Sequence, residues 1–127
     1  MSLSINKKEL FELLQKSFPI IPLKSSLQIL SNFRISFSDN RIEISATDLD
    51  HFLRVFSSVS GEGSFDITVN ARKFFEIVRE LPDGKVFLDL NENVLSIKSE
   101  GGFSCKIAGS DIHDFPGFPE IESTASF

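Results

Sequence analysis

The 127-residue sequence predicts an α+β fold, and three observations support this class. Two segments have the apolar spacing of amphipathic helices. Most of the remaining chain alternates apolar and polar residues, as strands with one buried face do. Both kinds of segment recur in the same order in the two halves of the chain. Two helices packed against antiparallel sheet are typical of α+β domains.

The clearer helical segment lies within residues 69–82. Asn70 is a residue type that caps the free N–H groups of a first helical turn. Pro82 lacks a backbone donor and disfavours helical geometry before it, so the helix ends there. The stripe expected to face the core consists of Phe74, Phe75, Val78 and Leu81, with Ile77 at its margin.

Arg72 and Lys73 lie in the first turn of this segment. The helix dipole is positive there, and each cation costs about 0.3–1 kcal/mol. This placement predicts that an anion outside the helix interacts with the two side chains.

The chain contains an internal repeat. Residues 4–15 align without gaps to residues 68–79 at an offset of 64, so that Asn6 matches Asn70 and Lys8 matches Arg72. Each copy predicts a short strand, an asparagine cap, basic residues in the first turn and an amphipathic helix. The repeats cover about residues 1–60 and 64–109.

Three further strands are predicted in each half, two of them joined as a hairpin. In the first half they are residues 33–37, 41–46 and about 52–58; in the second they are 86–90, 94–99 and 103–108. Residues 61–64 are expected to link the halves, and residues 65–69 to open the second as a strand.

Composition favours a soluble, intracellular protein. The single Cys105 has no intramolecular disulfide partner, which favours a reducing compartment. No apolar run approaches the roughly 20 residues of a membrane span. The first ten residues lack the apolar core of a signal peptide.

Charge is segregated along the sequence. The net charge of −5 argues against a nucleic-acid partner. However, residues 7–17 and 71–81 together with Lys24 hold seven basic and four acidic residues, a balance of +3 that leaves −8 on the rest. Such a distribution lets one surface attract a polyanion while the rest of the surface stays acidic. The alternative is chance clustering of charge on solvated helix faces.

Four motifs in this order resemble the bacterial sliding-clamp family, the β subunit of the replicative DNA polymerase. They are Ser26-Leu27-Gln28-Ile29-Leu30-Ser31-Asn32, Ala46-Thr47-Asp48-Leu49-Asp50, Val69-Asn70-Ala71-Arg72-Lys73-Phe74-Phe75 and Asp114-Phe115-Pro116. The resemblance covers residues 1–119 and only the N-terminal domain of that family. It implies that residues 120–127 begin an interdomain linker.

The resemblance implies a DNA-clamp fold with two helices, two antiparallel sheets and an internal pseudo-two-fold axis. It implies a non-catalytic processivity factor without cofactor, which encircles duplex DNA as a homodimeric ring of three domains per chain. Polymerase and clamp loader would bind a pocket formed by the other domains, and the protein would be cytoplasmic and nucleoid-associated.

The resemblance also implies roles for individual residues. The helices line the hole of the ring, which makes the following cations candidate DNA contacts: Lys7, Lys8, Lys24, Arg72, Lys73 and Arg79. Lys24 lies in the loop after the first helix, where many relatives carry arginine. The last strand pairs with the neighbouring subunit, so Phe103, Cys105 and Lys73 are candidate interface residues, whereas Ile107 is expected in the core.

Two other functions remain open from the residues. Asp48, Asp50 and His51 could form a metal or hydrolytic site, as could His113 beside Asp114, but two histidines without further ligand spacing are weak evidence. Asp48 is expected to stabilise a turn instead. No glycine-rich phosphate loop follows a predicted strand. The stronger alternative to a clamp is a non-enzymatic interaction module that binds protein through an exposed sheet edge.

Overall fold

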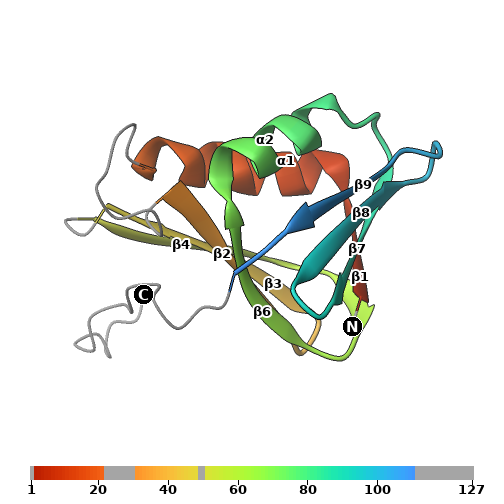
Figure 1. Cartoon of the computed structure of the whole chain (residues 1–127), viewed down its shortest axis with the longest axis horizontal. Helices are drawn as coiled ribbons and strands as arrows, with labels where there is room; N and C mark the ends of the chain where they lie inside the picture. The colour runs from red at the N-terminus through yellow and green to blue at the C-terminus, as the bar shows by residue number, and fades with distance from the viewer. Residues whose placement is uncertain (1, 22–30, 49–50, 111–127) are drawn as a thin grey trace.

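A computed structural model describes residues 2–21, 31–48 and 51–110 of the chain (Figure 1). Two helices lie side by side across one face of the molecule, and two antiparallel sheets lie beneath them. This arrangement confirms the predicted α+β class. Lys24, Asp50, His113 and the tail from residue 111 lie outside the described residues.

The two halves of the chain have the same order of elements. The first half contains β1 (Ser2–Asn6), α1 (Lys7–Ser17), the 3-10 turn η1 (Phe18–Ile20), β2 (Asn32–Ser38), β3 (Arg41–Thr47), β4 (Phe52–Ser58) and β5 (Ser60–Glu62). The second half contains β6 (Phe65–Asn70), α2 (Ala71–Glu80), β7 (Lys85–Asn91), β8 (Val94–Ser99) and β9 (Ser104–Ala108).

Each half contributes its first strand to the sheet of the other half. The sheets have the orders β5-β1-β7-β8-β9 and β4-β3-β2-β6. Ile5 of β1 therefore lies opposite Val86 of β7, and its equivalent Val69 of β6 lies opposite Phe33 of β2. Because of this exchange, each complete sheet contains strands from both halves.

Residues 61–64 join the halves as predicted, but a strand was not expected there: Ser60–Glu62 form β5 on the outer edge of β1. A Cβ atom at Gly61 would meet the Ser2 carbonyl oxygen and would lie 2.8 Å from Leu3 Cα and 2.7 Å from the Phe37 ring. The glycine is needed for this close approach of backbones. Ser4 and its repeat equivalent Thr68 have similar neighbours. Ser4 of β1 pairs with Ser60 in one sheet, and Thr68 of β6 forms a bridge with Ser110 in the other.

The two helices begin differently. Asn70 caps α2 as predicted, since its Oδ1 accepts a hydrogen bond from the Lys73 N–H at 2.9 Å. The predicted cap at Asn6 is wrong, because its side chain makes no capping bond to α1. Instead, the Lys7 N–H donates to the Gly84 carbonyl at 2.8 Å. The two helices thus find acceptors for different N–H groups of their first turns, the first one in α1 and the third one in α2.

The variant Asn70→Ala is expected to lose about 1 kcal/mol of unfolding free energy, because it leaves a first-turn N–H without its acceptor. Asn6→Ala is the matched control at the equivalent position, and should lose much less. Urea denaturation of both variants measures the difference. Equal losses would show that the Asn70 cap bond does not contribute.

The core lies between the helices and both sheets. The helices run antiparallel, since the start of α1 bonds to the loop after α2 and Phe18 stacks on Phe75 with ring centroids 4.6 Å apart. The equivalent rings of Phe11 and Phe75 contact each other, at 5.3 Å. The pseudo-two-fold axis therefore passes between these two rings. Beneath them, Leu10 and its equivalent Phe74 are fully buried.

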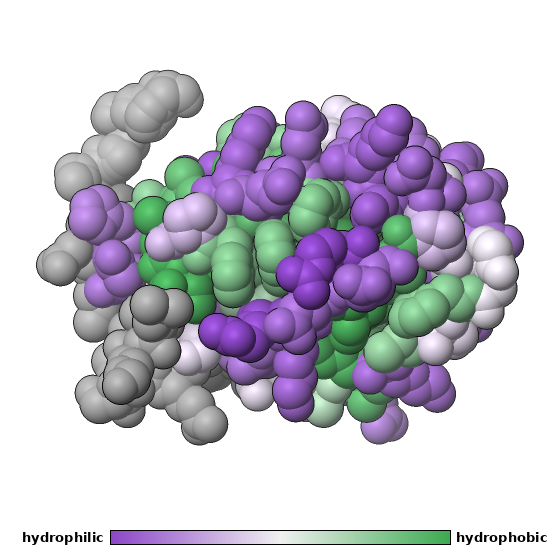
Figure 2. All heavy atoms as spheres, turned by 90° about the horizontal axis from the view of Figure 1, so that it is seen from above, coloured by the Kyte–Doolittle hydropathy of each residue, from purple (hydrophilic) through white to green (hydrophobic). Residues whose placement is uncertain are grey.

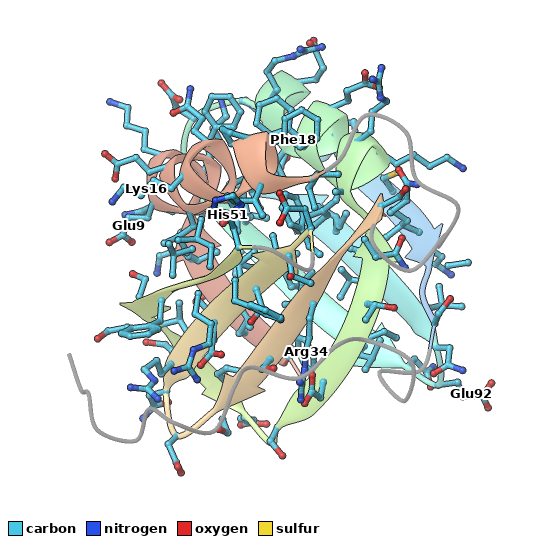
Figure 3. All side chains as sticks on the ribbon, turned by 90° about the vertical axis from the view of Figure 1, so that its left-hand side faces the viewer. Glu9, Lys16, Phe18, Arg34, His51 and Glu92 are labelled. Carbon is cyan, nitrogen blue, oxygen red and sulfur yellow. The ribbon has the colours of Figure 1, made fainter. Side chains whose placement is uncertain are left out.

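The outer face of the four-stranded sheet carries a cross-strand ion pair. Arg34 on β2 donates to both carboxylate oxygens of Asp66 on β6, at 2.9 and 2.6 Å, and the Ser36 hydroxyl donates to the same carboxylate at 2.9 Å (Figure 3). Hydrogen bonding to Asp66 raises the pKa of Arg34 above its ordinary value. The pair ties β2 to the exchanged strand β6.

Candidate nucleic-acid interface and sheet edge

The surface of the helix layer is divided into stripes. Figure 2 views this layer from above and shows hydrophilic side chains on both sides of an apolar strip. The strip includes the partly buried rings between the helices, those of Phe11, Phe18 and Phe75. The stripe opposite the buried side of each helix consists of Lys8, Glu12 and Gln15 in α1, and of their equivalents Arg72, Glu76 and Arg79 in α2.

Three of the six predicted DNA-contacting cations, Lys8, Arg72 and Arg79, lie on these outward stripes and are exposed. Lys8 and Arg72 occupy the only position of the stripe that is basic in both helices. Because the helices are antiparallel, the two side chains mark opposite ends of the helix layer. Arg79 Nε lies 3.4 Å from Glu80 Oε2, which partly neutralises that cation.

The other predicted cations have different surroundings. Lys7 is half-buried, and its Nζ lies 5.2 Å from the centre of the Phe11 ring in a cation–π contact. Lys73 lies on the flank of α2 that faces β9, where it lines a groove with Lys106. Lys24 is among the residues that the structure does not describe.

Acidic residues weaken the helix face as an anion site. Glu12 and Glu76 occupy equivalent stripe positions, one turn after Lys8 and Arg72, and both are exposed. The three stripe cations therefore exceed the two stripe acids by a single charge. Such a face attracts phosphate weakly, and strong binding would need several copies of it around one polyanion.

The predicted interface residues lie at the edge of the five-stranded sheet. Within the residues that the structure describes, no strand pairs with the outer side of β9. Phe103, Cys105 and Ile107 alternate onto one face, and their exposure falls along it: Phe103 is 38% exposed, Cys105 is half-buried and Ile107 is buried. Ile107 thus lies in the core as expected.

A groove of about 380 Å³ lies between α2 and this edge. It is lined by Lys73, Glu76 and Ile77 from α2 and by Lys106, Ile107 and Ala108 from β9. Its lining is half apolar, from Ile77, Ile107 and Ala108, and half charged, from Lys73, Glu76 and Lys106. Lys73 therefore lies beside the sheet edge, not on the outward stripe of the helix.

Asp48 and His51, two residues of the alternative metal site, hydrogen-bond to each other. Asp48 Oδ1 accepts from the His51 N–H at 2.7 Å, and the Thr47 hydroxyl donates to the His51 carbonyl at 2.8 Å. The turn prediction for Asp48 is confirmed. In residues 2–21, 31–48 and 51–110, no group of three or more His, Cys, Asp or Glu side chains is placed to hold a metal ion.

Comparison with known proteins decides the family. A family model described as "DNA polymerase III beta subunit, N-terminal domain" matches residues 1–119. The chain belongs to the bacterial sliding-clamp family. Proteins of this family are non-catalytic processivity factors, as the motifs predicted.

Relatives match this chain over almost all of its length. The beta sliding clamp of Vibrio cholerae serotype O1 is 32% identical over 126 residues, which are 97% of this chain and 34% of that protein. The beta sliding clamp of Bacillus subtilis is 27% identical over 130 residues, again 34% of that protein. The chain therefore spans about a third of the length of these relatives.

Solved clamp structures share the fold. Caulobacter crescentus pol III beta superposes with a TM-score of 0.88 at 28% identity, over 95% of this chain and 33% of that one. A Helicobacter pylori beta clamp bound to a DNA ligase peptide gives a TM-score of 0.87 at 26% identity, over 94% of this chain and 33% of that one.

Among the described residues, no helix is long and apolar enough to cross a membrane.

Proposed function

We propose that this domain is one segment of a ring-shaped clamp that encircles duplex DNA and tethers a replicative polymerase. The observation that carries the proposal is the pair of equivalent exposed cations, Lys8 and Arg72, on the outward face of two antiparallel helices. In a family of processivity factors, this is the face with the chemistry to contact phosphate. Weak attraction suits sliding, because strong base-specific contacts would hold the ring in place.

The assigned DNA contacts differ in weight. Lys8 and Arg72 are the primary DNA contacts. Arg79 contributes less, because the carboxylate of Glu80 lies beside it. Lys7 also contributes less, because its ammonium group already makes a cation–π contact with the Phe11 ring. Lys24 is assigned a point charge toward phosphate on the resemblance alone, since it lies outside the residues that the structure describes. Lys73 serves the rim of the β9 groove and reaches DNA only at its margin.

The edge of β9 is the proposed subunit interface of the ring, with Phe103, Cys105 and Lys73 as contact residues. An edge strand offers backbone donors and acceptors to a strand of the next subunit, and the half-exposed Phe103 offers apolar area. Ring closure is head-to-tail through a third domain. Polymerase and clamp loader bind other domains of the ring, which acts in the cytoplasm on nucleoid DNA.

The contacts can be tested in a chimeric ring in which residues 1–119 replace the matched domain of the Vibrio cholerae clamp. Arg72→Ala and Lys8→Ala should each lower DNA affinity and reduce the slope of log affinity against log salt by about 0.9 for each phosphate that is no longer neutralised. Lys98→Ala, on the outer face of the five-stranded sheet, is the charge-matched control and should change neither quantity. Unchanged slopes for both helix variants would contradict the assignment.

The alternative function is a protein-interaction module that binds a partner strand along β9 and has no role on DNA. The exposed edge and its groove favour it. In that case the helix variants would leave every DNA measurement of the chimeric ring unchanged, while changes at Phe103 would abolish partner binding.

A further inference from the structure

We propose that the outer face of the four-stranded sheet binds an acidic peptide segment of another protein. The peptide places an apolar side chain on the ring of Phe56 and its carboxylates on the two flanking arginines, Arg41 and Arg54. The helix layer and the edge of β9 take no part in this contact. The surface is therefore separate from both surfaces of the proposed function.

Arginines gather on this face of the sheet. Side chains alternate between the core and the outer face along a strand, and Arg34 of β2, Arg41 of β3 and Arg54 of β4 all point outward. Figure 3 shows Arg34 on this face. No lysine occurs in β2, β3, β4 or β6. The outward acids of these strands are Glu43 and Asp66, so three arginines exceed two acids by one charge, on a protein of net charge −5.

The three arginines have different partners. Arg34 is engaged in the bidentate ion pair described above. Arg54 Nη1 lies 3.9 Å from Glu43 Oε2, a long ion pair, and the Arg54 side chain is 50% exposed. Arg41 forms no ion pair with a carboxylate of the described residues, and its guanidinium lies 4.8 Å from the centre of the Phe56 ring. A guanidinium stacked on a ring keeps the N–H groups at its edge for a carboxylate.

Phe56 is the most exposed large apolar side chain among the residues that the structure describes, at 52%. Arginines flank it on both sides along the strand. Arg54 lies two residues before it on β4, and Arg41 lies opposite Ser58, two residues after it. Residues two apart on a strand share a face and lie about 7 Å apart. The exposed ring therefore lies between two guanidinium groups.

This order of cation, ring and cation determines the chemistry of the ligand. An extended peptide with an apolar residue between two acidic ones, each two positions away, has the same spacing as the surface. It brings a carboxylate to each guanidinium and covers the ring, and arginine and aromatic residues are enriched in protein interfaces. A nucleic acid is a poorer ligand, because Glu43 and Asp66 repel its phosphates.

The outer face of the five-stranded sheet provides a matched comparison. Its exposed ring, that of Phe87, is 40% exposed and lies directly opposite Lys98. A lysine ammonium is a strongly hydrated point charge and lacks the planar fork of a guanidinium. This second face has a ring beside a cation but no flanking arginines, so it should not bind the same peptide.

The test is a titration of the fluorescein-labelled peptide Asp-Ser-Phe-Ser-Asp with the 127-residue chain, followed by fluorescence anisotropy. We expect saturable binding that weakens with added salt, since exposed charges are screened. Arg41→Ala and Phe56→Ala should each weaken binding about tenfold, as truncation of a central interface residue does. Arg41→Lys keeps the charge but loses the planar fork, and its affinity should lie between those of Arg41→Ala and the parent chain.

Controls separate this surface from general charge and stickiness. Phe87→Ala and Lys98→Ala should bind the peptide like the parent chain. The peptide Lys-Ser-Phe-Ser-Lys reverses the charge and Asp-Ser-Ala-Ser-Asp lacks the ring, and each should bind the parent chain about tenfold more weakly. Absence of saturable binding, equal losses at both sheet faces, or equal binding of the three peptides would overturn the proposal.

Two other occupants of the surface give distinct results. A short DNA duplex that bound in an Arg41-dependent manner, while the peptide did not bind, would make the surface a phosphate site. Residues 111–127 contain four acidic residues and no Lys or Arg. If the peptide bound only to a chain carrying Asp111→Asn, Asp114→Asn, Glu120→Gln and Glu122→Gln together, the acidic segment of the chain itself would be the occupant. Either result would overturn the proposal.

The peptide surface and the DNA contacts can fail separately. Lys8→Glu with Arg72→Glu should leave peptide binding unchanged, because both residues lie on the helix layer. Arg41→Ala should leave the DNA affinity of the chimeric ring unchanged. A loss of both activities in either variant would contradict the assignment of two separate surfaces.

Discussion

Phe74→Ala is expected to lower the free energy of unfolding by about 3–5 kcal/mol, the usual cost of truncating a buried phenylalanine. Phe74 is fully buried on α2, at the position that Leu10 occupies in α1. The change removes a ring from the layer that joins both sheets to both helices. Chemical denaturation followed by circular dichroism measures the loss.

Phe87→Ala is the matched control, since Phe87 is 40% exposed on β7 and should cost only about 0.5 kcal/mol. If the two variants were equally stable, α2 would not pack on the core as described. Leu10→Ala should lower the free energy of unfolding by about 2–5 kcal/mol. This variant tests whether the equivalent position in α1 contributes as much to stability.

The charge reversals Lys8→Glu and Arg72→Glu, combined in the chimeric ring, are expected to lower DNA affinity on the order of 10²-fold at about 0.1 M salt. Each change removes a cation from the outward stripe and adds a repelling carboxylate beside Glu12 or Glu76. Fluorescence anisotropy with a duplex, across a salt series, measures both affinity and slope.

The control for this variant is Lys85→Glu with Lys98→Glu, which changes the net charge equally on the outer face of the five-stranded sheet. It should reduce affinity far less, because these side chains face away from the helix layer. Equal losses in both rings would mean that net charge governs the attraction and that the helix face has no special role.

Local sequence signals predicted most of the elements. Both helices, the two hairpins and the cap at Asn70 follow from apolar spacing, turn residues and capping chemistry, which act over a few residues. Asn6 has the same signal as Asn70, yet its side chain makes no capping bond, and the first N–H of its helix, that of Lys7, bonds to the carbonyl of Gly84, 77 residues further along the chain. A contact across the domain cannot be inferred from a capping motif.

Pairing between distant strands was also beyond sequence reasoning. The exchange of β1 and β6 between the halves depends on which partner edge is free, and nothing in either strand specifies this. Strand β5 contains Gly61, and Gly63 follows it, so the segment has the composition of a turn. Here Gly61 serves close packing on β1, a use of glycine that composition cannot distinguish from a bend.

The candidate site was predicted in part. The repeat identified Lys8 and Arg72 as equivalent positions, and both lie on the outward stripe. It could not assign Lys73 to one surface, because the side of α2 that faces β9 is known only once the sheet is assembled. The repeat also aligns Glu12 with Glu76. This alignment indicates that acidic residues lie beside Lys8 and Arg72 in both helices, and hence that the face is only weakly basic.

Retention of the chimeric ring on DNA tests the central claim most directly. The ring, loaded by a clamp loader, should remain on closed circular DNA through gel filtration and leave when the DNA is linearised, because a sliding ring departs only from an end. Rings carrying the Lys8 and Arg72 reversals should load poorly. Equal retention on circular and linear DNA, or on neither, would contradict the account of this domain as part of an encircling clamp.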